Sequence, residues 1–312
     1  MTESTAPTST PGSAPVAPRR GARTDRARSE RRLGLLLCAP AVVVMLAVTA
    51  YPILYAVYLS LQRYDLRFPG RASFVGLENY GTVLGNGLFR TDLLNTVFIT
   101  VVSVAIELVL GMLVALVMHR TIFGRGPVRT SVLIPYGIIT VVAALAWQYA
   151  WTPEVGFLPG WLHLTDAPLT NRGSAIVIII IAEVWKTTPF MSLLLLAGLA
   201  LVPDELLEAA RVDGASAWQR FVRITLPLMK PAILVAVLFR TLDAFRIFDN
   251  IFILTSGGHS TASLSLLSYD QLVVGLNLGV GSAISVIIAL IIAAIGIVFV
   301  KGFGAAAPGG SR

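Results

Sequence analysis

Ionisable side chains interrupt an apolar stretch between residues 175 and 201. Glu183, Lys186, Thr187 and Phe190 occur at positions i, i+3, i+4 and i+7, so they share one face of a helix. Carboxylate, ammonium and hydroxyl groups can hydrogen-bond the hydroxyl groups of a sugar, and an aromatic ring can pack on its apolar face. This stripe predicts a binding site for a hydroxylated solute. The alternative is a Glu183–Lys186 ion pair that only stabilises helix packing.

Four charged residues of alternating sign lie in a second apolar stretch, 231–254. Arg240, Asp243, Arg246 and Asp249 are three residues apart, so neighbours can form ion pairs, although the four spread over about half of a helix circumference. One interpretation is a self-paired ladder. In the other, Arg240 and Asp243 face a substrate path, while Asp249 and Asn250 fix the helix end.

The stretches that carry these residues are apolar and long. The chain has 312 residues, of which 55% are hydrophobic and 13% charged, and its mean hydropathy is +0.78. Soluble proteins have roughly 25% charged residues. A membrane-spanning helix needs about 20 mostly apolar residues. Six segments meet this requirement, which predicts an all-α integral membrane protein with six transmembrane helices: 33–61, 93–118, 131–151, 175–201, 231–254 and 279–301.

The distribution of basic residues predicts the orientation. Sixteen of the 24 basic residues lie in the two ends of the chain and in the second and fourth loops, against five in the other loops. Cytoplasmic segments are rich in Lys and Arg, so both termini are expected inside. Residues 1–32, rich in Ser, Thr, Pro and then Arg, are expected to form a disordered cytoplasmic tail, and residues 302–312 a short one. The high share of Arg and Ala is typical of a bacterial membrane protein from a high-GC genome.

The fourth loop, residues 203–230, is much longer than a simple connection requires. Pro203-Asp204-Glu205 is expected to start one helix, Gly214 to end it, and an amphipathic helix to follow from Ala215 until Pro227. An amphipathic helix lying on lipid is one interpretation. The small residues of the loop favour the other, which is close contact with a water-soluble partner.

A sequence pattern in this loop resembles a known family. Residues 208–215 read Glu-Ala-Ala-Arg-Val-Asp-Gly-Ala, and Ile224-Thr225-Leu226-Pro227 follows about ten residues on. This pattern resembles the EAA loop of permease subunits of ATP-binding-cassette (ABC) importers. The residues 248–251 and 254–258 resemble the sugar branch related to the maltose importer, although His259 stands where many relatives have Pro.

The resemblance covers about residues 33–301 and implies the type I permease fold of these importers. It implies that the loop is a coupling helix seated in an ATPase subunit, and the residues it assigns to this contact are Glu208, Ala209, Ala210, Asp213, Gly214, Ala215, Leu226 and Pro227. It also implies three partners: a second related permease, an ATPase dimer that binds ATP and Mg²⁺, and an extracellular substrate-binding lipoprotein.

The substrate expectation rests on the same resemblance. The stretches Glu183–Leu201 and Phe239–Asn250 are similar to permeases of mycobacterial trehalose importers, which implies uptake of a disaccharide, trehalose, by alternating access. Maltose-type relatives bind sugar near a stretch that here runs from Val184 to Phe190, but Glu183 and Lys186 are charged where the maltose relative is uncharged. Another sugar or a glycerol-phosphate-type solute is the alternative.

Several function classes fit the sequence less well. No G-x-x-x-x-G-K-[ST] phosphate loop occurs, so the chain is not expected to bind ATP or to be an enzyme. Its histidines, His119, His163 and His259, lack the spacing of metal ligands, so no metal site is expected either. The basic residues are spread over loops, which disfavours nucleic acid as a partner. An ion-coupled transporter would use Glu107, Glu183 or Asp243 as proton carriers, and the alternative for Glu107 is a packing or gating pair. A membrane enzyme or scaffold lacks a recognisable catalytic set.

Overall fold

The computed structural model describes residues 21–68, 70–120, 125–164 and 166–303. The chain divides into two compact units, Met1–Tyr55 and Ala56–Arg312, and the second contains the groups discussed below. In chain order the first elements are α1 (Gly21–Ser60), β1 (Gln62–Arg63), β2 (Ser73–Phe74), α2 (Glu78–Gly85), α3 (Gly87–Arg120), α4 (Arg125–Gly137), α5 (Thr140–Trp151), α6 (Leu158–Trp161) and η1 (Pro168–Thr170). They are followed by α7 (Arg172–Leu199), α8 (Asp204–Val212), α9 (Ala217–Arg220), η2 (Phe221–Thr225), α10 (Leu226–Leu228), α11 (Lys230–Ala244), α12 (Asp249–Leu254), η3 (Gly258–Ser260), α13 (Leu264–Tyr269), η4 (Asp270–Val274) and α14 (Leu278–Phe303).

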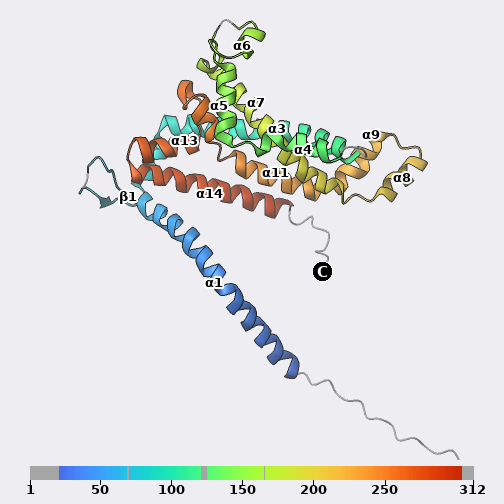
Figure 1. Cartoon of the computed structure of the whole chain (residues 1–312). Helices are drawn as coiled ribbons and strands as arrows, with labels where there is room; N and C mark the ends of the chain where they lie inside the picture. Colours follow the sequence, from blue (N-terminus) through green and yellow to red (C-terminus); the bar gives the residue numbers. More distant parts are fainter. Residues whose placement is uncertain (1–20, 69, 121–124, 165, 304–312) are drawn as a thin grey trace, which may run out of the picture. The chain divides into compact units, whose positions relative to one another are not determined.

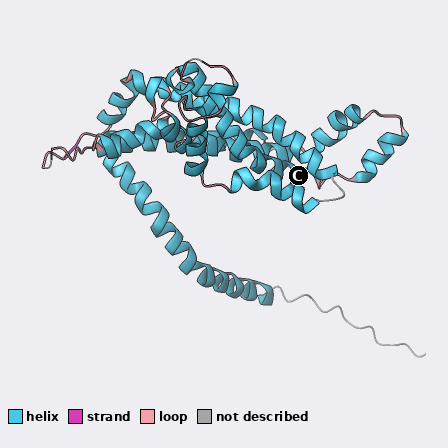
Figure 2. Ribbon diagram, turned by 45° about the horizontal axis from the view of Figure 1, so that its top comes forward, coloured by secondary structure: helices cyan, strands magenta, loops and turns pink. Residues whose placement is uncertain are grey.

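Helices long and apolar enough to cross a membrane occupy four ranges of the described residues: Arg32–Ser60, Gly87–Arg120, Arg172–Leu199 and Leu278–Gly302. Two further helix pairs pass the same test together, so the number rises to six if each bent pair is one span. The segments predicted to span are helical over most of their length, but segments 131–151 and 231–254 each contain a break and are not the single helices expected. Figure 2 shows how far helices dominate the chain.

The first helix begins earlier than predicted. α1 starts at Gly21, whereas the sequence predicted a disordered tail up to residue 32. Ala and Arg, which recur between residues 22 and 32, are strong helix formers, so the helix can continue beyond its apolar part. Residues 1–20 and 304–312 of the two predicted tails lie outside the described residues.

The third predicted span is broken at residues 138–139. α4 and α5 meet there at an angle of 89°. Pro135 and Gly137 lie at the end of α4 and weaken helix continuation. The carbonyl of Ile138, which the break leaves without a helical partner, accepts a hydrogen bond from Lys186 Nζ at 2.6 Å.

The fifth predicted span is broken at residues 245–248. α11 ends at Ala244, and α12 starts again at Asp249. The sequence predicted Asp249 and Asn250 at the end of a long helix. They lie instead in the first turn of a short one, α12. The Ser263 hydroxyl donates to the freed carbonyl of Ile247 at 2.8 Å. Because this partner comes from a distant segment, the apolar pattern of residues 231–254 gave no sign of the break.

The helices α3, α7, α11 and α14 form the body of the second unit and lie side by side in Figure 1. α3 and α7 approach closely because Gly111 has no side chain: a Cβ there would lie 2.7 Å from Met191 Cγ. Gly198 permits the same approach between α7 and α11, since its Cβ would lie 2.5 Å from Ala232 Cβ. α7 is the central element of this body.

A short hairpin connects α1 to α2. β1 and β2 are antiparallel, with Gln62 opposite Phe74 and Arg63 opposite Ser73. Asp65 in the turn accepts hydrogen bonds from the Arg67 side chain and backbone, and these bonds lower the pKa of its carboxyl group. The Asn79 amide donates to the carbonyls of Ser60 and Gln62 at 2.8 Å and so holds the hairpin against α2.

Candidate functional site

A polar cavity of about 540 Å³ lies where the two helix breaks meet α7. Non-helical backbone at membrane depth is tolerated where it is buried in protein or lines a cavity. The cavity has the volume of a small-molecule site, which is about 300–1,000 Å³ in proteins. It is lined by Tyr136, Ile138, Ile139, Thr140, Glu183, Lys186, Thr187, Asp243, Arg246, Ile247, Phe248, Asp249 and Asn250.

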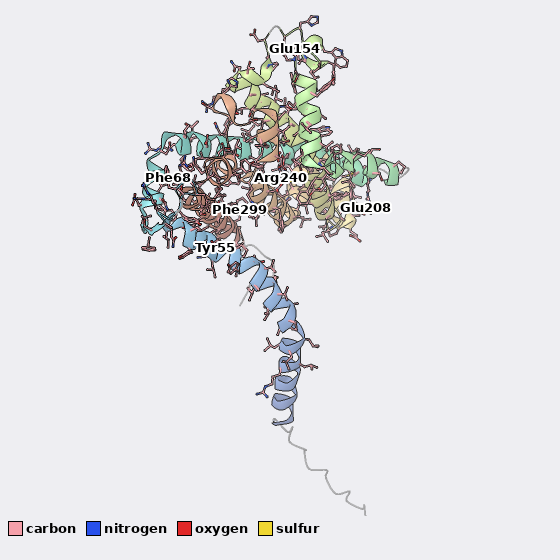
Figure 3. The ribbon with its side chains drawn as sticks, turned by 60° about the vertical axis from the view of Figure 1, so that its left-hand side comes forward. Tyr55, Phe68, Glu154, Glu208, Arg240 and Phe299 are labelled. Carbon is pink, nitrogen blue, oxygen red and sulfur yellow. The ribbon has the colours of Figure 1, made fainter. Side chains whose placement is uncertain are left out.

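The guanidinium group of Arg240 is fully buried beneath this cavity. Its Nε and Nη2 atoms donate to the two carboxylate oxygens of Glu107 on α3, at 2.5 and 2.8 Å, in a bidentate ion pair. Nη1 donates to Asp243 at 2.5 Å and Nη2 to Glu183 at 3.1 Å. Figure 3 shows Arg240 in the interior of the helical body. One cation thus connects α3, α7 and α11.

This arrangement corrects the self-paired ladder. Arg240 does bond Asp243, but its two shortest contacts to another helix are with Glu107, 133 positions away in sequence. The packing pair considered for Glu107 is present as an ion pair with Arg240. Arg240 is fully buried and does not line the cavity, and its place on the substrate path stays a prediction.

Glu183 connects the buried network to the cavity. Its Oε1 accepts from Arg240, and its Oε2 accepts from the Asn250 amide on α12 at 2.6 Å. The alternative of a Glu183–Lys186 pair is therefore not what the described residues form. A carboxylate with both oxygens occupied has a fixed orientation, so Glu183 presents a preorganised hydrogen-bond acceptor to the cavity.

Lys186 and Tyr136 also line the cavity. Lys186 Nζ donates to the Ile138 carbonyl and lies 5.9 Å from the centre of the Tyr136 ring. The Phe190 ring stacks on the Tyr136 ring, with ring centres 5.4 Å apart. Phe190 itself does not line the cavity, and the aromatic residues that do are Tyr136 and Phe248.

The structure thus brings together most of the predicted substrate residues. Glu183, Lys186, Thr187 and Asp243 line one cavity, together with the helix-end residues Asp249 and Asn250. Sequence reasoning missed Tyr136, Thr140 and Arg246. The Pro135-Tyr136-Gly137 turn signal could have located the first break. No local signal connects Glu107 with Arg240.

The predicted coupling residues lie in a helix–turn–helix that projects from one end of the second unit (Figures 1 and 2). α8 carries Glu208, Ala209 and Ala210, and none of its residues is buried. Gly214 follows with φ +81°, a left-handed conformation that favours glycine. The backbone N–H of Ala215 donates to the Ala210 carbonyl at 2.9 Å and closes the turn.

The second arm of the loop runs through α9, η2 and α10, from Ala217 to Leu228, and contains Leu226 and Pro227. It starts at a capping box, in which the Ser216 hydroxyl accepts from the Gln219 backbone and the Gln219 side chain accepts from the Ser216 backbone. The arm ends at Leu228, between Pro227 and Pro231, the two prolines expected to end it. Pro231 lies in the first turn of α11, where proline is tolerated.

A shallow hollow of about 330 Å³ opens beside the turn between the two arms. Three of its lining residues, Asp213, Gly214 and Ala215, belong to the EAA pattern, and Arg220 and Arg223 supply positive charge. Arg220 Nη1 donates to the Ala215 carbonyl at 2.5 Å and fixes the turn to the second arm. The loop therefore presents a defined shape at its tip, rather than a flexible connection.

Comparison with known proteins gives one consistent family. Residues 80–305 match the model of the binding-protein-dependent transport system inner membrane component. The chain is 60% identical to the trehalose transport system permease protein SugA of Mycobacterium tuberculosis, over 92% of this chain and 94% of the relative. It is 41% identical to the trehalose/maltose transport system permease protein MalF of Thermococcus litoralis, over 87% and 94% respectively.

Among solved structures, the fold is similar to a chain of a bacterial ABC transporter involved in the import of the acidic polysaccharide alginate. The TM-score is 0.75 at 23% identity, over 89% of this chain and 96% of that one. The sequence match covers more than half of the chain, and the relatives match along nearly their whole length. The chain therefore belongs to the family of binding-protein-dependent transport system inner membrane components, and it is a non-catalytic permease subunit that spans the membrane several times.

Proposed function

We propose that this permease imports a disaccharide, trehalose, and that the polar cavity beneath the two helix breaks is the substrate site. The cavity carries the proposal: it supplies carboxylate, ammonium, amide and hydroxyl groups beside the aromatic rings of Tyr136 and Phe248, in the volume range of a small-molecule site. A site built to hydrogen-bond hydroxyl groups discriminates strongly against solutes that lack them. The name of the relative at 60% identity supports trehalose as the particular sugar.

The proposed mechanism is alternating access driven by partner subunits. An extracellular binding protein delivers the sugar, a second related permease completes the pathway, and a partner ATPase dimer binds ATP and Mg²⁺. The helix–turn–helix at residues 203–230 contacts the ATPase on the cytoplasmic side, with both chain termini inside. Two observations support this role. The residues of α8 are not buried and can contact a partner, and the hydrogen bond from Arg220 to the Ala215 carbonyl holds the turn in one conformation.

The buried network disfavours the ion-coupled alternative. A proton carrier must exchange its proton with solvent during transport, but Glu107 and Glu183 are both bonded to Arg240, and Glu107 is fully buried. Asp243 is exposed but also bonds Arg240. Neutralising these carboxylates would leave the guanidinium group without its partners.

Deletion of the gene is expected to abolish uptake of radiolabelled trehalose at low external concentration, and expression of the intact chain is expected to restore it. Uptake of an unrelated labelled amino acid by the same strain is the control for membrane energisation. If trehalose uptake is unimpaired while another labelled sugar or glycerol phosphate no longer enters, the substrate assignment is wrong, although the permease role remains.

Substitution in the coupling loop is expected to stop transport without unfolding the protein. Gly214→Val forces a β-branched residue into the left-handed region, which costs about 1–2 kcal/mol and displaces the turn. Glu208→Gln removes the charge of the EAA pattern on the exposed helix. We expect trehalose uptake to fall by at least about tenfold in both, which corresponds to about 1.4 kcal/mol of lost coupling.

The structure offers matched controls for both changes. Gly70 has φ +89° and open space around it, as Gly214 does, but lies in the β1–β2 hairpin, so Gly70→Val introduces the same strain elsewhere. Glu205→Gln removes an exposed charge from the same helix outside the pattern. Co-purification of the ATPase is measured alongside uptake. Normal uptake and normal ATPase recovery in both loop variants would refute the coupling role.

A further inference from the structure

An apolar groove of about 980 Å³ separates α3 from the bent helix pair that leads out of the coupling loop. Leu108, Met112, Leu113 and Leu116 of α3 line one wall, and Phe221 and Ile233 are among the residues of the other. The second wall is bent because the Ala217–Leu228 and Lys230–Ala244 helices meet at 68°. Ordered water needs several polar partners, and the lining of this groove is almost entirely apolar. An apolar surface of this size is typical of a binding site for an apolar group.

The groove has the length of one membrane leaflet. The α3 wall extends from Leu108 to Arg120, which at 1.5 Å per residue is about 18 Å. Half of a hydrocarbon core of about 30 Å is about 15 Å. A groove that extends from the middle of the membrane to its surface, on the side of the coupling loop, matches the extended acyl chain of a phospholipid.

Two cations mark the surface end of the groove. Arg120 is the last residue of α3 and Lys230 the first of α11, and both line the groove and are exposed. The lining includes no carboxylate, and within the described part of the chain neither cation forms an ion pair. Trp218, with 71% of its surface exposed, lies in the same lining and has the amphipathic ring typical of the membrane interface.

We propose that this groove binds an acidic phospholipid of the loop-side leaflet, with its phosphate between Arg120 and Lys230 and an acyl chain along α3. Charge complementarity selects this occupant over a neutral lipid or an apolar protein helix, because neither would compensate the two cations. Each basic residue near an anionic lipid surface increases binding about fivefold. The lipid would contact both arms of the 68° bend, so its binding would brace the angle at which the coupling loop leaves the membrane.

Quenching of Trp218 by lipids with brominated acyl chains tests the proposal. The complete permease complex is placed in nanodiscs of phosphatidylcholine with a minor share of brominated phosphatidylglycerol, or with the same share of brominated phosphatidylcholine. Subtracting the signal of Trp218→Phe isolates this residue from the other tryptophans. Two basic residues at about fivefold each predict that Trp218 quenching requires about 25-fold less brominated phosphatidylglycerol than brominated phosphatidylcholine.

Charge variants make the test specific. Arg120→Gln combined with Lys230→Gln is expected to remove the preference for phosphatidylglycerol, whereas Lys301→Gln, an exposed lysine near the end of α14 that does not line the groove, is expected to preserve it. Equal quenching by both brominated lipids in the unchanged protein would overturn the proposal in favour of ordinary solvation by lipid. Absence of quenching by either would overturn it in favour of a protein segment that covers the groove.

Discussion

Replacing Arg240 by methionine is expected to destabilise the protein by about 3–5 kcal/mol, the typical effect of removing one partner of a buried ion pair. Methionine fills much of the same volume, so the loss is mainly electrostatic. The change leaves Glu107, which is fully buried, without a cation, and also removes a contact from Glu183 and one from Asp243. The measurement is the midpoint of thermal unfolding of the detergent-purified complex, together with the amount of permease recovered from membranes.

Arg246→Met is the matched control for this change. Arg246 lies six residues further on and lines the cavity, but it is exposed and has no ion pair among the described residues. Its replacement is expected to shift the unfolding midpoint little. An Arg240→Met variant that unfolds like the Arg246→Met variant would show that the buried network contributes no stability.

A second substitution separates charge from packing. Glu107→Gln neutralises the main partner of Arg240, so the double variant Glu107→Gln, Arg240→Met contains one uncompensated carboxylate fewer than Arg240→Met alone. It is expected to be more stable than the single Arg240→Met variant, with a coupling energy of about 0.5–3 kcal/mol. Additive effects would instead assign the loss to the missing volume of the arginine side chain.

Much of the architecture followed from composition and periodicity. Long apolar segments predicted the helices, and the Gly214 and Pro203 signals predicted the shape of the coupling loop, because these effects are local. Four of the predicted segments contain long apolar helices, and three of the four residues of the stripe at 183–190 line one cavity. A helical face can be read from spacing because the helix has a fixed number of residues per turn.

The break at residues 245–248 could not be predicted in this way. Residues 245–248 include Phe245, Ile247 and Phe248, so the apolar pattern continues through a backbone that is not helical. The break persists because Ser263 satisfies the Ile247 carbonyl and Glu183 holds Asn250, and both contacts join segments far apart in sequence. Arg240 likewise has its main ion pair with Glu107, 133 residues away, rather than with a neighbour in the ladder, and this pairing also depends on tertiary structure. The position of this break and the partner of Arg240 therefore depend on tertiary contacts, which residue spacing within one segment does not reveal.

Lys186 also makes a tertiary contact that supports a helix break. We expect its replacement to reduce transport more than that of any other residue that lines the cavity. Its ammonium group holds the freed carbonyl of Ile138 at the break between α4 and α5, and it lies beside the Tyr136 ring. It is one of two basic residues in the lining, beside the acids Glu183, Asp243 and Asp249. Lys186→Met would therefore loosen the break and make the cavity more negative.

Trehalose uptake by Lys186→Met is expected to fall by about tenfold to a hundredfold, since a hydrogen bond to a charged group contributes about 1.5–3 kcal/mol. Lys186→Arg retains the charge and a donor and is expected to retain most of the uptake at a raised KM. Lys301→Met, which removes an exposed lysine outside the cavity, is the control. Uptake is measured over a range of trehalose concentrations, with ATPase recovery as the check on assembly. If Lys186→Met assembles and transports with unchanged KM and maximal rate, the cavity is not the substrate site, because a buried ammonium group beside the sugar cannot be removed without changing how the sugar binds.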